Sequence, residues 1–239
     1  MMIEIKNLTK TYGDTAVVDD LSLTVKTGST FGFLGQNGAG KTTTIKMMVG
    51  LARPDAGTVT IGGKPTSDPA AREQVGFMPE APYFYERLTG LEFLRFCGQL
   101  FTQSYARPDD DYRRILTTVG IGDAADRPIR VYSKGMKQRL GFAQTLVNDP
   151  AYVFLDEPLD GLDPIGRREI KAIIHELHRQ GKTIFFNSHI LYDTEELCDE
   201  VGIIHRGRLL YAGPVKEFCR RKPLEERFVE VVTAATKNE

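Results

Sequence analysis

The run from Gly35 to Thr43 constrains the fold of this chain more than any other stretch. It reads Gly-Gln-Asn-Gly-Ala-Gly-Lys-Thr-Thr and fits the pattern G-x-x-x-x-G-K-[ST] without a mismatch. A short apolar segment, 30–34, precedes it, and apolar residues at helical spacing follow it as far as Val49. A strand, a glycine-rich loop and a helix in this order predict a phosphate-binding loop in an α/β protein.

Each part of this run has a task in binding a nucleoside triphosphate. The glycines let successive backbone N–H groups point at one centre, where the helix N-terminus adds its positive end. The lysine is expected to reach the β- and γ-phosphates, and the first threonine to place its hydroxyl on Mg²⁺. The predicted nucleotide contacts are Gly35, Asn37, Gly38, Ala39, Gly40, Lys41, Thr42 and Thr43. A glycine-rich turn that matches by chance is the alternative, and the flanking segments argue against it.

The pattern of apolar residues predicts an α/β core interrupted by helices. Residues up to about 81 alternate as strands do, residues 82–147 have helical spacing, and strands and helices alternate again after Pro150. In this last part we expect strands at 152–155 and 183–187, helices at 166–180 and 195–199, a hairpin turning at Arg206, and one or two short helices from Lys216. We therefore expect one domain over 1–239, with a core of 1–81 and 150–215, a helical subdomain of 82–149 and a helical tail of 216–239.

Composition narrows the class of protein. A chain of 239 residues with 41% hydrophobic and 26% charged residues suits one large globular domain. The three cysteines are widely spaced, which argues against a disulfide framework and fits a reducing cytosol. No apolar run approaches the length of a membrane span, and the first residues lack an apolar signal core. The net charge of −1 gives no electrostatic argument for nucleic acid.

Two further apolar segments end in residues that suit triphosphate hydrolysis. The segment 152–155 is followed by Asp156 and Glu157, and the segment 183–187 is followed two residues later by His189. At a strand end beside the phosphate loop, Asp156 would hold Mg²⁺ and Glu157 would act as general base on the attacking water. A parallel neighbouring strand would bring His189 to the same sheet edge and to the γ-phosphate. Taken singly, a solvated strand end and a surface histidine are the ordinary alternatives.

These segments, with Tyr132 to Arg139 between them, resemble the ATP-binding subunits of ABC transporters over about residues 3–213. The resemblance implies a P-loop NTPase core of α/β class, with a mixed sheet, an antiparallel β subdomain and an inserted α-helical subdomain. It also implies roles for single residues. Tyr12 matches the aromatic that stacks on adenine, Glu80 the metal-sensing position, Ser133, Gly135 and Met136 the signature, Asp163 the loop that communicates across the dimer, and His189 the switch histidine.

The chain departs from the usual family pattern at three positions. Glu80 stands in place of a glutamine, so that an acid that could ligate Mg²⁺ replaces a neutral amide. Lys134 and Met136 replace a glycine and a glutamine of the signature, whereas Ser133 and Gly135 are kept. These changes are similar to the ABC-2-type exporter branch, as are the segments 82–89 and 224–229.

The resemblance implies partners as well as a cofactor. Two subunits, most simply a homodimer, would enclose two Mg-ATP, each between one subunit's phosphate loop and the other's signature. Closing and opening of this pair would power a separate ABC-2-type membrane permease, for export, from the cytoplasmic face of the membrane. Residues Tyr83 to Tyr85 would dock on that permease or, alternatively, pack the helical subdomain.

Two other classes of function fit the sequence less well. A soluble ABC-type ATPase acting on nucleic acid or ribosomes would carry coiled-coil insertions or two nucleotide domains, and the chain has neither. A GTPase or small-molecule kinase would leave the segment 133–139 unexplained, and the chain has no N-K-x-D segment for reading guanine. The sequence therefore favours the transport ATPase.

Overall fold

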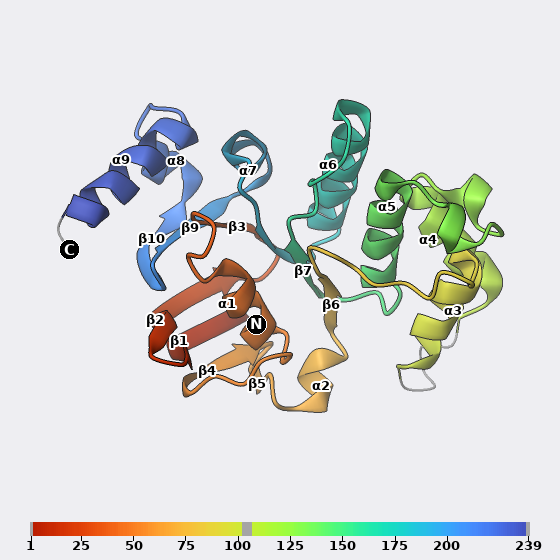
Figure 1. The fold of residues 1–239 in the computed structure, drawn as a ribbon, viewed down its shortest axis with the longest axis horizontal. Helices are drawn as coiled ribbons and strands as arrows, with labels where there is room; N and C mark the ends of the chain where they lie inside the picture. The colour runs from red at the N-terminus through yellow and green to blue at the C-terminus, as the bar shows by residue number, and fades with distance from the viewer. Residues whose placement is uncertain (1, 102–106, 238–239) are drawn as a thin grey trace. The chain divides into compact units, whose positions relative to one another are not determined.

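The computed structural model of the chain describes residues 2–101 and 107–237 (Figure 1). The chain forms two compact units. The first consists of residues 1–72 and 183–239, and the second of residues 73–182.

The first unit contains an antiparallel sheet. Its strands lie in the order β2 (Thr15–Lys26), β1 (Met2–Tyr12), β4 (Ala56–Ile61) and β5 (Lys64–Pro65). Buried apolar residues alternate with more exposed ones over 2–5 of β1 and 21–26 of β2, as in the pair Ile5 and Leu23. This alternation is why the segment forms strands with one face toward the core. The antiparallel sheet inferred from the family resemblance is confirmed.

A second group of strands in the same unit is mixed in direction. It runs in the order β10 (Arg208–Pro214), β9 (Glu200–His205), β3 (Thr30–Leu34) and β8 (Thr183–Asn187). The central strand β3 is parallel to both β8 and β9, whereas β9 and β10 form an antiparallel hairpin. All residues of β3 and β8 are buried, which fits the apolar residues that fill the middle of both strands. The predicted strand at 183–187 and the predicted hairpin are confirmed.

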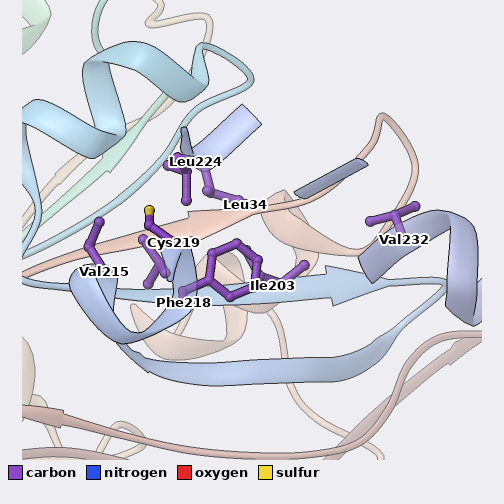
Figure 2. Close-up of a cluster of buried hydrophobic side chains, with 8 residues drawn as sticks. Leu34, Ile203, Val215, Phe218, Cys219, Leu224 and Val232 are labelled. Atoms are coloured by element: carbon purple, nitrogen blue, oxygen red, sulfur yellow. The ribbon is translucent and has the colours of Figure 1, made fainter. Parts of the chain in front are cut away.

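The helices of the first unit include a C-terminal pair that covers the end of β3. They are α1 (Lys41–Met48), α2 (Pro69–Arg72), α7 (Leu191–Leu197), α8 (Val215–Cys219) and α9 (Leu224–Lys237). Figure 2 shows the cluster in which Phe218 and Leu224 from these helices meet Leu34 and Ile203. Leu34 is the last residue of β3, so this packing anchors the strand that leads into the glycine-rich loop. One or two short helices were expected from Lys216 onward, and the structure has two, α8 and α9.

The second unit combines a parallel pair of strands with helices. The strands are β6 (Val75–Met78) and β7 (Tyr152–Asp156), and the α-helices are α3 (Gly90–Gln99), α4 (Asp109–Thr118), α5 (Lys134–Thr145) and α6 (Pro164–Arg179). Two short 3₁₀ helices, 122–124 and 129–131, connect α4 to α5. Local sequence fixes the helix starts. Thr89 and Glu92 form a capping box at α3, and Asp163 caps α6, whose first residue is a proline.

The structure differs from the sequence-based expectations in two features. The short helix expected at 195–199 is wrong in its bounds, because α7 begins at Leu191 and Cys198 is already extended. The strand β6 was not predicted, since four residues are too few for a clear alternation. A Cβ on its Gly76 would lie 2.1 Å from the carbonyl oxygen of Thr145, and this close approach to α5 requires glycine.

Candidate functional site

The glycine-rich loop lies between β3 and α1, as predicted, and is held by the neighbouring hairpin. A Cβ on Gly35 would lie 2.6 Å from the carbonyl oxygen of Ile204, and one on Gly40 would lie 2.5 Å from that of Val17. Gly40 is also the N-cap of α1, with φ of 105°. The Gly207 N–H donates to the Ala39 carbonyl at 3.0 Å. The curl of the loop is therefore fixed by close backbone contacts that a side chain would prevent.

The lysine of the loop is folded back over the loop itself. Lys41 is only 7% exposed, and its Nζ donates to the carbonyl oxygens of Gly35 at 2.7 Å and Gln36 at 3.2 Å. Gln36, Asn37 and Gly38 are exposed, and a Cβ on Gly38 would meet nothing within 4 Å. The loop thus keeps an open outer side while its carbonyls surround the ammonium group. Thr42 and Thr43, in the first turn of α1, are half-buried.

His189 follows β8 at the sheet edge where the loop follows β3. The two strands are parallel, with Phe33 opposite Asn187, two residues before Gly35 and His189 respectively. His189 is exposed, and the Ser188 hydroxyl accepts the Ile190 N–H at 3.0 Å in the turn around it. The expectation that a parallel neighbouring strand brings the histidine to the loop's edge of the sheet is confirmed.

Tyr12 lies at the end of β1, and its ring is half-exposed. The Lys10 Nζ sits 5.4 Å from the centre of the ring, and Asp55 accepts both this ammonium and the Thr11 N–H. An exposed aromatic ring of this kind can stack on a flat heterocycle such as adenine.

In the second unit, the acidic residues gather at the carboxyl edge of two parallel strands. Met78 of β6 pairs with Leu155 of β7, so that Glu80 follows one strand as Glu157 follows the other. Asp156 is 2% exposed, whereas Glu80 is exposed. Glu157 has φ of 53°, in the left-handed region that a residue with a Cβ rarely adopts. Strained backbone of this kind occurs in turns, as at Arg206, and also gathers at functional sites.

The segment that resembles the signature forms the first turn of α5. Ser133 is the N-cap, and its hydroxyl accepts the Met136 N–H at 3.2 Å. Tyr132 before it is buried, its hydroxyl donates to the Ala124 carbonyl at 2.6 Å, and burial raises its pKa. Ser133 and Lys134 are exposed, and a Cβ on Gly135 would have 3.7 Å to its nearest neighbour, in Leu162. The helix N-terminus is thus accessible, with its positive dipole end outward.

The loop before α6 lies beside this turn. The Lys134 Nζ is 3.6 Å from a carboxylate oxygen of Asp160. Asp163, for which the resemblance implies a role between subunits, accepts the Gly166 N–H at 2.7 Å and caps α6. The structure therefore brings the signature turn and the loop 160–163 together within one unit.

The aromatic run Tyr83 to Tyr85 has one ring that packs against a helix and two rings that are exposed, so its rings differ in which of the two expected roles they suit. The ring of Phe84 packs edge-on against Phe93 of α3, with centroids 5.2 Å apart. Tyr83, by contrast, is 97% exposed, and Tyr85 is exposed beside Phe96, which it contacts edge-on. One ring anchors the segment, and the other two leave an aromatic surface open to solvent.

The chemistry of these groups suits a phosphate ligand with Mg²⁺. Among the described residues, no cluster of three or more His, Cys, Asp or Glu side chains could hold a metal by itself. Mg²⁺ is ordinarily bound by one or two carboxylates together with substrate phosphates, and Asp156 and Glu80 of the second unit are carboxylates of this kind. In the first unit, the Thr42 hydroxyl is an oxygen donor beside the loop. No helix in the described part of the chain is both long and apolar enough to cross a membrane.

Comparison with known proteins gives a consistent result. The model of the ABC transporter family matches residues 18–160. An uncharacterized ABC transporter ATP-binding protein of Synechocystis sp. is 50% identical over 202 residues, which are 82% of this chain and 56% of that protein. A fluoroquinolones export ATP-binding protein of Mycobacterium tuberculosis is 41% identical over 213 residues, 87% of this chain and 69% of that protein.

Solved structures agree with these relatives. A structure described as the ATP binding subunit of an ABC transporter is 30% identical, with a TM-score of 0.87, and the match covers 97% of this chain and 99% of that one. The chain spans little more than half the length of the Synechocystis relative. Because the family model alone matches more than half of the chain, the chain belongs to the ABC transporter family.

Proposed function

We propose that this chain is an ATP-binding and ATP-hydrolysing subunit that powers a separate membrane permease. The observation that carries the proposal is the loop 35–43, curled around the Lys41 ammonium with its outer side open. A triphosphate offers that ammonium stronger partners than the two loop carbonyls, because phosphate oxygens carry a negative charge that attracts the ammonium and the carbonyls carry only a dipole. Stacking of adenine on Tyr12 would complete nucleotide binding.

In this proposal the chain's own residues divide the work of hydrolysis. The attacking water forms a bond to the γ-phosphorus, its proton passes to the Glu157 carboxylate, and the bond to the ADP oxygen breaks. His189 contacts the γ-phosphate, and Lys41 offsets charge on the β- and γ-phosphates. Thr42, Asp156 and Glu80 would hold Mg²⁺, which when bound neutralises further phosphate charge.

We further propose a homodimer in which each nucleotide contacts two subunits. The exposed turn of Ser133, Gly135 and Met136 offers a hydroxyl and backbone N–H groups at a helix N-terminus, the chemistry that binds phosphate. Asp163 lies in the loop beside this turn and would lie near the subunit boundary. ATP stabilises the closed dimer, and the dimer opens after hydrolysis. The γ-phosphate thus shifts the equilibrium between the open and closed states toward the closed one.

The permease partner is proposed to be of the ABC-2 type. The exposed rings of Tyr83 and Tyr85 give a docking surface for its cytoplasmic side, since exposed aromatic residues are enriched at interfaces. The name of the mycobacterial relative supports export as the direction. In this assembly the chain lies peripherally on the inner face of the cell membrane. An ATPase that acts on nucleic acid is less well supported, because the chain has no basic excess.

The substitution Glu157→Gln tests the proposal. It keeps the size of the side chain but removes the base, so turnover should fall at least about a hundredfold while Mg-ATP still binds. The closed dimer should then accumulate in ATP and be seen by size-exclusion chromatography. Glu225→Gln, an exposed change in the first turn of α9, is the control and should behave as wild type. Normal turnover of Glu157→Gln would remove Glu157 as the base.

A further inference from the structure

A buried glutamine on α5 reaches the main chain of the proposed catalytic base. Gln138 is 7% exposed, and its Nε2 lies 3.3 Å from the Glu157 carbonyl oxygen and 3.4 Å from that of Pro158. A side-chain amide carries two N–H donors, so one Nε2 can serve both carbonyls. The donor side of the Gln138 side chain is thus directed at the two residues that follow β7.

The carbonyl that Gln138 contacts belongs to a residue with an unfavourable backbone. Glu157 has φ of 53°, and such a conformation persists only where the surrounding structure holds it. The Glu157 carbonyl also accepts the Asp160 N–H at 3.2 Å. Two donors from different segments therefore meet on one oxygen and fix the orientation of this peptide plane. That plane, with the dihedral angles on either side, sets the direction in which the Glu157 side chain leaves the backbone.

Other contacts hold α5 in place but reach different residues. Lys134 is paired with Asp160, and the Arg139 guanidinium donates to Glu169 and to the Val119 carbonyl. These interactions fix the helix in place, and the amide of Gln138 acts on Glu157 itself. In the sequence, Gln138 is one residue of the run Tyr132 to Arg139, and its position in that run does not indicate a role.

We propose that Gln138 is a positioning residue for ATP hydrolysis, which holds the Glu157 peptide so that the carboxylate meets the attacking water. The inference rests on the proposed function, in which Glu157 is the general base. Gln138 itself makes no bond to water or nucleotide. Its loss should therefore slow the chemical step and leave nucleotide binding unchanged, because a displaced base lowers kcat without affecting contacts to ATP.

The substitution Gln138→Leu tests this inference. Leucine keeps a similar volume and removes both donors, so that the Glu157 carbonyl keeps the Asp160 N–H but loses the amide, and the Pro158 carbonyl loses the amide as well. We expect kcat of the purified chain to fall about tenfold or more, with KM and the dissociation constant of Mg-ATP within about twofold of wild type. Gln144→Leu makes the same change nearly two turns further along α5 and is the matched control. Its kcat should stay at the wild-type value.

A second measurement separates positioning from general damage to the fold. Combined with Glu157→Gln, the loss of Gln138 should cause no further fall in single-turnover hydrolysis, because no base remains to be positioned. If the leucine variant folds poorly, Gln138→Met takes its place. Methionine keeps the length and flexibility of the side chain without its donors, and kcat should fall as expected for Gln138→Leu.

Three outcomes would overturn the inference. They are a normal kcat in a folded Gln138 variant, an equal loss in Gln144→Leu, and an additive loss in the double variant with Glu157→Gln. Failure of the proposed function looks different, since Glu157→Gln alone would then turn over normally. An inactive Glu157→Gln together with a fully active Gln138→Leu would refute only the positioning role.

Discussion

The Nζ of Lys41 donates to the carbonyl oxygen of Gly35 at 2.7 Å, so the loop that is proposed to bind phosphate is closed by its own lysine. The bond holds the loop in a curled form before any ligand arrives. A loop ordered in advance loses less conformational entropy when it binds, which favours affinity. When a triphosphate binds, charged phosphate oxygens would compete with the neutral carbonyls of Gly35 and Gln36 for this ammonium.

Lys41→Ala should weaken Mg-ATP binding by about ten- to a hundredfold, the range expected when a hydrogen bond to a charged group is lost. Isothermal titration calorimetry measures the affinity directly. Lys46→Ala, an exposed change on the same helix α1, is the control and should bind as wild type does. An unchanged affinity of Lys41→Ala would contradict the assignment of the phosphate loop.

The parts of the site that local sequence determines were predicted correctly. The loop 35–43, the strand ending at Asp156 and the strand before His189 each rest on a run of residues that specifies its own conformation. The position of His189 at the sheet edge of the loop was expected because parallel strands present their carboxyl ends at one edge, and the parallel pairing of β3 with β8 provides it.

The features that were not predicted depend on contacts between distant residues. The Glu157 carbonyl, in a residue with left-handed backbone, accepts a hydrogen bond from Gln138, nineteen positions earlier. The pattern of residue types does not predict a contact between residues so far apart in the sequence. The strand β6 exists because Gly76 lets it approach the carbonyl of Thr145. The start of α7 was missed because no side-chain cap precedes it at Ile190.

Ser133→Arg should impair hydrolysis in the partner's nucleotide site rather than in its own. The side chain caps α5 at an exposed turn, where an arginine would fill the space proposed for the other subunit's γ-phosphate. In a mixed dimer, one subunit carries Ser133→Arg and the other Lys41→Ala. If the signature acts across the dimer, both lesions fall on one nucleotide site and the other stays active.

A dimer that carries both substitutions in the same subunit is the comparison. It should have one lesion in each nucleotide site and hydrolyse least. Steady-state ATPase activity of the two purified mixed dimers distinguishes the arrangements. The reverse order of activities would show that Ser133 serves its own subunit's site and would refute the shared site.

Replacing the exposed rings of Tyr83 and Tyr85 by serine should weaken assembly with the permease and leave the isolated chain's ATP binding unchanged. Tyr83 is almost fully exposed, and Tyr85 packs edge-on against Phe96, which is itself exposed, so their loss leaves the buried core intact. Central aromatic anchors of an interface typically contribute about 2 kcal/mol or more each. Tyr192→Ser, which removes an equally prominent exposed ring from α7, is the control. Co-purification with a co-expressed ABC-2-type permease measures the effect, and undiminished recovery would locate the docking surface elsewhere.

The cysteine thiols should be poorly reactive while the chain is folded. Burial raises the pKa of Cys97 from 9.0 to about 12, and burial also raises the pKa of Cys198 and of Cys219. A thiol that titrates near 12 rather than 9 holds about a thousandfold less thiolate at pH 8, and the thiolate is the reactive form. Labelling by a small aromatic disulfide at pH 8 should therefore be at least about tenfold slower in buffer than in urea.

The same shift makes stability depend on pH in the alkaline range. Because the folded chain holds Cys97 in its neutral form, this contribution to the free energy of unfolding is complete below the unfolded pKa near 9.0 and is lost as the pH rises toward about 12. In Cys97→Ala the fall in the urea midpoint between pH 8 and pH 10 should be smaller than in wild type. The smaller side chain also lowers stability at every pH, so the comparison is between slopes and not between midpoints. Equal slopes in the two proteins would mean that Cys97 titrates alike in the folded and unfolded chains.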